Sequence, residues 1–454
     1  MCFSRIVYCV LLSLLWGALN VFGLGAHELL VIANRNDPVS VRIARHYMHQ
    51  RHVPRQNLVL LNILPDDDGN YLSIGRDAFT KQIWEPVCRA ISQRNLEHVL
   101  AWVFSTHIPF RVDSSPPVSV QGLVFVRNRN LSHDEIARAV YASPLFVGPS
   151  RPDDVLLPPR SIQIAAKSLR DDMPIPAMAL GYIGPRGNTE SEVMEMLEKS
   201  IAADTSSPSG SVFFVTGNDI RAQAREWQFH RVQDQLQKMG MDAVITNQLP
   251  RRAESILGIM MGTRHVEPDQ IGNFIPGAVA EHLTSYGAFF DNPSQTKISR
   301  WIAAGATGTA GTVTEPYAVW AKFLHARFYM HYRSGYSLLE SYYLSLRHPL
   351  QSFLIGDPLM RPWAPQARLQ IAGLRNQEML RTPREIRVDI TAPAGVRYDR
   401  VVYLINGLIA GEGRQFRLDP ATLEPGLYEL RAVGYRAGLV STPISDMVQF
   451  QIGP

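Results

Sequence analysis

The sequence predicts an α/β fold in which a mostly parallel sheet carries helices on both faces, followed by a C-terminal immunoglobulin-like β-sandwich. Residues 27–365 alternate short apolar runs with helical patterns, which is typical of strand–helix units in a parallel sheet. After Trp363 the helical period stops, and short alternating runs follow. Because Pro362 and Pro365 lie at this change, we expect a linker there and a sandwich over residues 366–454.

Short apolar runs bounded by polar residues predict the strands of the α/β domain. They are Leu29–Ala33, Asn57–Asn62, His98–Phe104, Val212–Val215, Val244–Ile245, Ile256–Met261, Ala278–Leu283 and Thr309–Val313. Nearly continuous apolar character over such short runs indicates strands that are covered on both faces.

Helix signals lie between these runs. Asp37 and Pro38 begin one helix, because Asp is a favourable N-cap and Pro suits the first helical position. Thr189 and Glu192 form a capping box at the start of another. Apolar periodicity predicts further helices at Arg221–Met239, Gln295–Ala304, Tyr317–Tyr332 and Ser337–Arg347.

Two segments depart from the strand–helix alternation. Residues at about 110–173 are rich in Pro, Ser and Arg, and we interpret them as an insertion over one end of the sheet. In the C-terminal segment Ile386, Val388 and Ile390 alternate as in a strand, and Asn406-Gly407 lies between two apolar runs. An Asn-Gly pair in that position predicts a tight hairpin, which supports the sandwich.

The N-terminus has the pattern of an export signal. Ile6–Trp16 is an apolar run of signal-peptide length after a single basic residue, and the small residues that follow predict cleavage after Ala26. A membrane anchor is the alternative, although the run is short and is soon broken by Gly17. We therefore expect residues 1–26 to be a signal peptide and the mature chain to lie in the periplasm or outside the cell, not spanning the membrane.

Composition excludes several classes of protein. The chain has 454 residues, 45 Lys+Arg against 41 Asp+Glu and a net charge of +4, which gives no reason to expect nucleic-acid binding. It has three cysteines, and only Cys88 would remain after signal cleavage, so a disulfide scaffold is excluded. No paired His or Cys spacing predicts a metal site. The Gly-rich stretch Gly305–Gly311 matches no phosphate-binding motif, so we expect no cofactor.

Polar residues follow several predicted strands directly. Carboxyl ends of parallel strands meet at one edge of a sheet, so these residues predict a common polar rim. The binding candidates on it are Asn34, Asn36, Asp37 and Glu315. The catalytic candidates are the hydroxyls of Thr284 and Ser285 as nucleophile and the imidazoles of His265 and His107 as general base. A cap role for Asp37 and a surface role for the histidines are the alternatives.

Four stretches together resemble an uncharacterised family of exported bacterial proteins. They are LLVIANRNDPVSVRIARHYMHQRHVPRQNLVLL, IPGAVAEHLTSYGAFF, QTKISRWIAAGATGTAGTVTEP and FLIGDPLMRPW. That family occurs in species that carry exosortase protein-sorting systems linked to exopolysaccharide production. The resemblance implies a cell-envelope setting and brings no known activity with it.

The order of parts also resembles the gingipain-like branch of caspase-fold cysteine peptidases. Gly262–His265, Thr284–Gly287, Gly305–Gly311 and Gly356-Asp357-Pro358 follow one another before the sandwich, as the corresponding parts do in those peptidases. The chain departs from them at the decisive positions. The His-Gly pair is absent, because His265 is followed by Val266, and no cysteine lies near Thr284. Cysteine-peptidase activity therefore has no support.

These observations favour a non-catalytic, peptidase-like protein of the cell envelope, a pseudoenzyme that binds or helps to assemble envelope proteins or polysaccharide. The alternative is a hydrolase that uses Ser285 or Thr284 with His265 or His107. A purely structural assembly factor remains a third interpretation that the sequence does not separate from the first.

Overall fold

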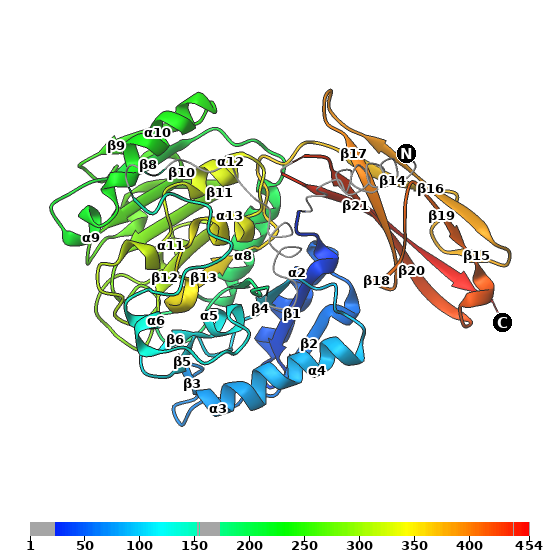
Figure 1. Ribbon diagram of the computed structural model, residues 1–454, viewed down its shortest axis with the longest axis horizontal. Helices are drawn as coiled ribbons and strands as arrows, with labels where there is room; N and C mark the ends of the chain where they lie inside the picture. The colour runs from blue at the N-terminus through cyan, green and yellow to red at the C-terminus, as the bar shows by residue number, and fades with distance from the viewer. Residues whose placement is uncertain (1–22, 152–153, 155–172, 439, 454) are drawn as a thin grey trace, which may run out of the picture.

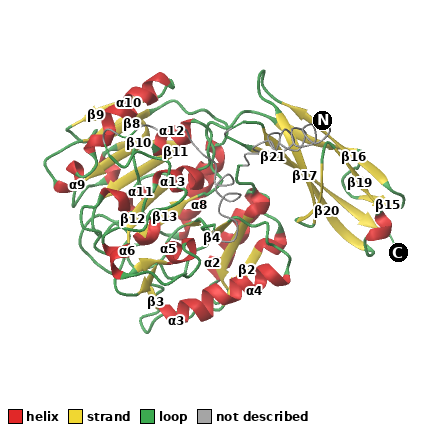
Figure 2. Cartoon of the chain, in the orientation of Figure 1, coloured by secondary structure: helices red, strands yellow, loops and turns green. Residues whose placement is uncertain are grey.

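The computed structural model describes residues 23–151, 154, 173–438 and 440–453. Most of the predicted signal peptide, and part of the predicted insertion, lie outside the described residues. The chain forms an α/β region (residues 23–365) and a C-terminal β region (residues 366–453), which lie side by side in Figure 1. Figure 2 shows helices gathered in the α/β region, while the C-terminal β region consists almost wholly of strands and loops.

One ten-stranded sheet organises the α/β region. Its strands, in spatial order, are β2 (Leu58–Leu61), β1 (Leu29–Asn34), β4 (Ala101–Phe104), β7 (Ala177–Ala179), β13 (Ser352–Gly356), β12 (Gly308–Thr312), β11 (Gly272–Leu283), β10 (Ala253–Gly262), β8 (Ser211–Val215) and β9 (Asp242–Thr246). The long pairings are parallel, except that β12 and β13 are antiparallel. Strand β13 meets β7 at the single pair Ile355–Ala179. The predicted mostly parallel sheet is confirmed.

Helices and loops cover both faces of this sheet. Every residue of β1, β4, β12 and β13 is buried, as expected for strands with no solvated face. The helices are α2 (Pro38–Gln50), α3 (Arg76–Phe79), α4 (Glu85–Gln93), α5 (Val120–Phe125), α6 (His133–Ala137), α8 (Glu190–Ala203), α9 (Ile220–Gln223), α10 (Phe229–Lys238), α11 (Ser299–Ala303), α12 (Phe328–Arg333) and α13 (Leu338–Ser345). A π-helical stretch over Thr80–Trp84 joins α3 to α4.

Helix starts agree with the capping signals in the sequence. The Asp37 carboxylate accepts the Ser40 N–H at 2.9 Å at the start of α2, with Pro38 as the first helical residue. Thr189 and Glu192 exchange hydrogen bonds as a capping box at the start of α8. Local hydrogen bonding therefore explains where these helices begin.

Three expected helices are shorter than their periodicity predicts, and the one expected over Gln295–Ala304 is reduced to α11. Arg221–Met239 is divided into α9, a 3-10 turn at Glu226–Gln228, and α10. Most of Tyr317–Tyr332 is irregular, with a 3-10 turn at Trp320–Lys322 before α12. In each of these two stretches a polar side chain bonds to a residue far away in the sequence. Arg225 contacts Glu281, and Lys322 donates to the Ala137 carbonyl at 2.6 Å.

The described part of the Pro-rich segment is integrated into the fold and does not simply lie over one end of the sheet. It contributes β5 (Arg111–Asp113) and β6 (Val118–Ser119), which form a small sheet with β3 (Ser73–Gly75). All six residues of α5 are buried, and the Gln121 amide exchanges two hydrogen bonds with the backbone of Leu354 in β13, at 2.8 and 2.9 Å. These residues therefore bond directly to a central strand of the large sheet.

The C-terminal β region consists of two sheets packed on a common core. One sheet is β14 (Arg368–Ala372), β16 (Arg384–Thr391) and β19 (Gln415–Leu418); the other is β15 (Glu378–Leu380), β21 (Pro443–Ile452), β20 (Gly426–Arg436), β17 (Tyr398–Ile405) and β18 (Leu408–Glu412). Ile386 and Leu418 from the first sheet share a buried cluster with Tyr403, Leu430 and Phe450 from the second. Most pairings are antiparallel, as the alternating pattern predicts.

Candidate functional site

The loops after β1, β2 and β4 are tied together by one buried side chain. The Asn34 amide nitrogen donates to the carbonyls of Ile63 and His107, both at 3.0 Å, and its oxygen accepts the N–H groups of Ile63 and Asn36 at 3.2 Å. Asn36 also donates to the Ile63 carbonyl at 3.1 Å. Four predicted site residues, Asn34, Asn36, Asp37 and His107, therefore lie together, and we call them the rim cluster.

Asp37 and His107 form a carboxylate–imidazole pair within the rim cluster. His107 Nδ1 lies 3.2 Å from Asp37 Oδ1 and 3.2 Å from the Thr106 hydroxyl oxygen. Both neighbours suit Nδ1: the carboxylate can accept from an Nδ1–H, and the Thr106 hydroxyl can donate to a bare Nδ1. Burial lowers the pKa of His107, while the nearby charges of Asp37 and Glu190 oppose that shift.

The backbone of His107 adopts a left-handed conformation, with φ of +57°. This conformation is unfavourable for a residue with a side chain, and it persists only where the surroundings impose it. Here the surroundings are the Asn34 hydrogen bond to the His107 carbonyl and the edge of the Tyr71 ring, whose centroid lies 5.6 Å from that of the imidazole. The imidazole is held in a defined place and is partly exposed.

Thr284 and Ser285, the candidate nucleophiles, lie in a different set of contacts. The buried Thr284 hydroxyl donates to the Gln295 side-chain oxygen at 2.5 Å, and Ser285 is only 8% exposed. His265 is exposed on the loop after β10. Within the described parts of the chain, no hydroxyl–imidazole hydrogen bond joins Thr284 or Ser285 to His265 or His107.

Glu315, the remaining binding candidate, has a local role. Its carboxylate accepts the N–H of Tyr317 at 2.9 Å, where the Tyr317 backbone has φ of +56°. The contact closes a turn after β12 and does not join Glu315 to the rim cluster.

Other polar side chains near the loop after β11 were missed by sequence reasoning. Arg111 pairs with both carboxylate oxygens of Asp291, at 3.2 and 3.3 Å, and its guanidinium lies 4.7 Å from the centre of the Phe289 ring. Arg186 donates to the Phe290 carbonyl at 2.9 Å. The loops that follow β4, β7 and β11 therefore meet, although the sequence showed the strand-end position of only the first and the last of these loops.

Lys297 is a second residue that the sequence does not single out. Its ammonium donates to the carbonyls of Tyr286 and Ser294, at 2.8 and 2.6 Å, and burial lowers its pKa to about 8. These bonds hold the loop that carries Ser285 and Tyr286 onto the start of the α11 segment.

Among the described residues we also looked for metal ligands, membrane-spanning helices and a reactive thiol. No group of three or more His, Cys, Asp or Glu side chains there could hold a metal ion, and no helix of that part is long and apolar enough to cross a bilayer. Cys88 is half-buried, and burial raises the pKa of its thiol, which lowers its reactivity at neutral pH.

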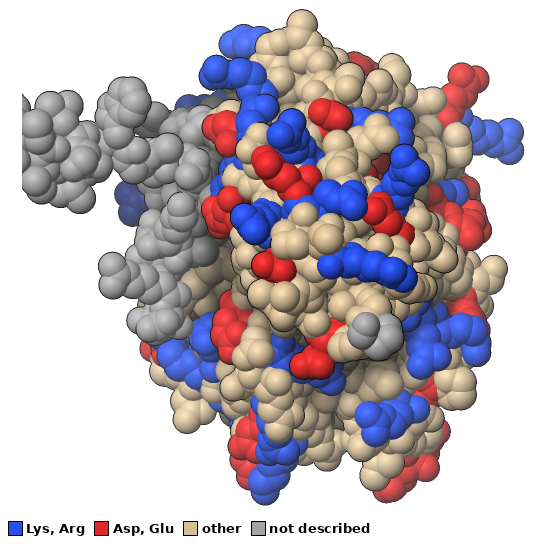
Figure 3. All heavy atoms as spheres, turned by 90° about the vertical axis from the view of Figure 1, so that its right-hand side faces the viewer, with Lys and Arg blue, Asp and Glu red and all other residues tan. Residues whose placement is uncertain are grey.

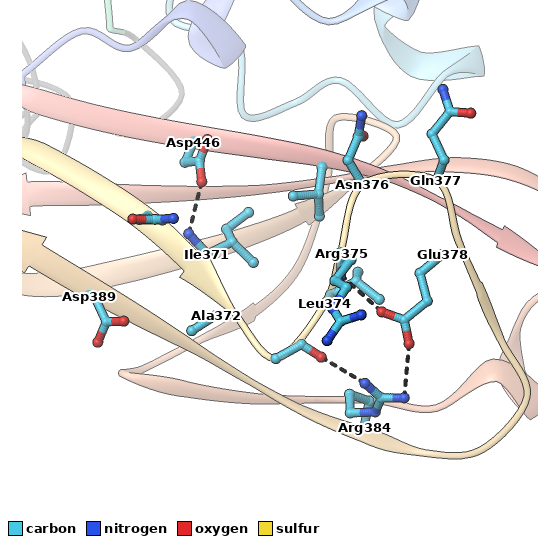
Figure 4. Close-up of a pocket in the computed structure, with 13 residues that line it drawn as sticks. Ile371, Ala372, Leu374, Arg375, Asn376, Gln377, Glu378, Arg384, Asp389 and Asp446 are labelled. Atoms are coloured by element: carbon cyan, nitrogen blue, oxygen red, sulfur yellow. Dashed lines mark hydrogen bonds and ion pairs between the residues drawn. The ribbon is translucent and has the colours of Figure 1, made fainter.

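The C-terminal β region carries an open groove of about 1120 Å³, drawn in Figure 4. Asp446 of one sheet accepts the Ile371 N–H of the other at 2.8 Å, and Arg384 pairs with Glu378 at 3.0 Å. Asn376 and Gln377 also line the groove. Its lining is polar and of mixed charge, which suits hydrogen bonding more than apolar packing.

Charge is mixed on the surface as well. On the face shown in Figure 3, Lys and Arg side chains lie interspersed with Asp and Glu, and they do not gather into one basic stripe. This distribution agrees with the small net charge of +4.

Comparisons with known proteins add little. No family model matches the chain, and no curated protein matches it. A fibronectin(III)-like module structure from Clostridium thermocellum CbhA aligns with 19% of this chain and 96% of its own, at 13% identity and a TM-score of 0.16. An endo-beta-1,4-mannanase from Thermotoga petrophila aligns with 81% of this chain and 82% of its own, at 8% identity and a TM-score of 0.17. A beta-glucosidase from Listeria innocua aligns with 58% and 49%, at 9% identity and a TM-score of 0.18. Scores this low do not establish a shared fold.

Proposed function

We propose that the chain is an exported cell-envelope protein that binds envelope proteins or polysaccharide without catalysing a reaction. In this proposal a caspase-like α/β domain carries an immunoglobulin-like sandwich, and the rim cluster is the recognition surface. The observation that supports it is the use of the Thr284 hydroxyl as an internal donor to Gln295, with the nearly buried Ser285 beside it. A hydroxyl that acts as nucleophile needs a base within hydrogen-bond reach.

A covalent probe tests the absence of a hydroxyl nucleophile. We expect purified mature protein to show no labelling by a fluorophosphonate that is specific for activated serine. Labelling that disappears in Ser285→Ala but persists in the exposed control Ser191→Ala would contradict the proposal.

Binding is tested at the rim cluster with variants that keep the fold. Asp37→Asn retains an N-cap oxygen for α2 but removes the charge beside His107. We expect this variant and His107→Ala to lose retention on immobilised exopolysaccharide or on a solubilised envelope-protein fraction, whichever the unmodified protein binds. The control Glu198→Gln, on the exposed face of α8, should bind normally. Equal binding by all four proteins would exclude the rim cluster as the recognition surface.

One observation favours a hydrolase as the second candidate. The Asp37 carboxylate lies 3.2 Å from His107 Nδ1, and the His107 backbone has a constrained conformation of the kind that gathers at active sites. His107 would then act as general base on a water molecule, because neither hydroxyl candidate contacts it. Hydrolysis of an ester or peptide library that is lost in His107→Ala, without fluorophosphonate labelling, would select this candidate.

A further inference from the structure

The segment just before β1 is buried in the body of the protein. Leu24 is 1% exposed and belongs to the main apolar core. Its carbonyl accepts a hydrogen bond from Arg361 Nη2 at 2.7 Å, and its N–H donates to Glu340 Oε1 at 3.3 Å. Arg361 pairs in turn with the other oxygen of Glu340 at 3.0 Å. Leu24 is therefore a structural part of the folded chain.

Gly25 and Ala26 are equally engaged. The Gly25 N–H donates to Glu28 Oε2 at 2.7 Å, and Ala26 begins a 3-10 turn that leads into β1. Removing Leu24 to Ala26 would take the acceptor from Arg361 and the donor from Glu28, both of which are buried. Leaving a buried guanidinium and a buried carboxyl group without these bonds is costly. A cut after Ala26, as the sequence pattern predicts, would therefore weaken the fold.

Cleavage of the peptide bond between Gly23 and Leu24 would keep all of these contacts in the mature chain. Gly23 is a small residue, as the position before a leader cut requires. In the uncut chain Gly23 is itself tightly enclosed, because a Cβ placed on it would lie 1.5 Å from the Ser441 carbonyl oxygen. Gly23 therefore lies close against the C-terminal β region, with no room there for a side chain.

A carboxylate is the acceptor at the Leu24 nitrogen, because Glu340 Oε1 lies 3.3 Å from it. Glu28 and Glu340 are both buried, and Arg361 is the guanidinium that pairs with Glu340. Burial is the main cause that raises the pKa of Glu28 to about 8. The hydrogen bond from the Gly25 N–H lowers this pKa, and the negative charge of Glu340 raises it. An ammonium at the Leu24 nitrogen would add positive charge at an atom that already donates to Glu340.

We propose that an export-associated leader peptidase hydrolyses the Gly23–Leu24 bond, and that the new α-ammonium of Leu24 forms a buried ion pair with Glu340. Water is the second reactant: the carboxylate is left on Gly23, and the released Leu24 amine takes up a proton. The inference rests on the proposed export of the chain. It makes the mature N-terminus a structural element of the α/β region.

The first test identifies the mature N-terminus. The full chain is produced with its own leader in a bacterial host, the exported fraction is purified, and its N-terminus is determined by sequencing and intact mass. We expect a chain that begins Leu-Gly-Ala-His. Exported protein that begins at His27 or at any other residue overturns the inference and leaves the proposed export intact. Protein that stays uncut inside the cell overturns both.

The second test measures the ion pair itself. Acetylation of the Leu24 amine removes its charge. We expect acetylation to lower the Tm of the Leu24-initiated protein by about 2 °C or more, and to change the Tm of Glu340→Gln by clearly less. The control Glu198→Gln should respond to acetylation as the unmodified protein does. Equal shifts in all three proteins would show that the ammonium does not pair with Glu340.

Discussion

At the scale of the residue, Asn34 is the side chain on which the rim cluster depends most. It is fully buried and makes four hydrogen bonds to the backbone of three loops. Asn36 lies next to it but is exposed and makes two hydrogen bonds. These two asparagines, two positions apart in the sequence, therefore differ in burial and in the number of hydrogen bonds that they make.

We predict that Asn34→Ala lowers the free energy of unfolding by about 2–4 kcal/mol, because buried partners such as the Ile63 and His107 carbonyls lose their donor. The matched control Asn36→Ala should cost roughly 0.5 kcal/mol. Urea unfolding followed by circular dichroism measures both values. Equal losses in the two variants would mean that the Asn34 network does not hold the loops.

Sequence reasoning placed polar residues at strand ends but could not pair them. Asn34, Asp37 and His107 lie together because β1 and β4 are adjacent parallel strands, although β2 and β3 come between them along the chain, so the order of the strands in the sequence does not give this neighbour relation. The acceptor of the Thr284 hydroxyl is Gln295, eleven residues further on. That contact depends on the path of an irregular loop, for which the sequence carries no period.

At the scale of the element, turn chemistry was the most informative signal. The predicted hairpin at Asn406-Gly407 joins β17 to β18, with φ of +48° and +79° at the two residues. Helix lengths were less predictable, because apolar periodicity continues through Arg221–Met239 while the buried Arg225–Glu281 pair interrupts the helix. Tertiary contacts of this kind override local pattern.

The same hairpin turn also contacts the α/β region. A Cβ on Gly407 would lie 2.0 Å from Gln56 Nε2 and 2.7 Å from Pro54 Cβ, whereas Gly395, with φ of +80°, has open space around it. We predict that Gly407→Ala destabilises the protein by more than Gly395→Ala, which carries only the backbone cost of about 1 kcal/mol. The difference in urea midpoints isolates the contact between the two regions. Identical midpoints would show that this turn is free of the α/β region.

At the scale of the whole molecule, many ionisable groups are buried between packed elements. His27 donates to or accepts from the Tyr435 hydroxyl at 3.0 Å across the two regions, and Arg431 donates to the His52 carbonyl. Burial is the largest cause that lowers the pKa of each of several histidines: His27, His325 and His331 to about 3, and His282 and His348 to about 4. These histidines are neutral in the folded protein at pH 5–6.

These buried histidines predict that the protein loses stability as the pH falls below about 6.5. Their pKa values are lower in the folded chain than in the unfolded chain, so the unfolded chain binds more protons in this range and acid favours it. Glu28, with its pKa raised to about 8, and Glu281 and Asp357, whose pKa values burial also raises, release protons on unfolding and oppose the effect, but they are three carboxyl groups against five histidines. We expect the urea midpoint to fall continuously from pH 6.5 to pH 4.5, with net proton uptake on unfolding. His348→Gln should reduce that slope, because it removes one of the five groups. A midpoint that is constant or rises over this range would show that these histidines are not held neutral by the fold.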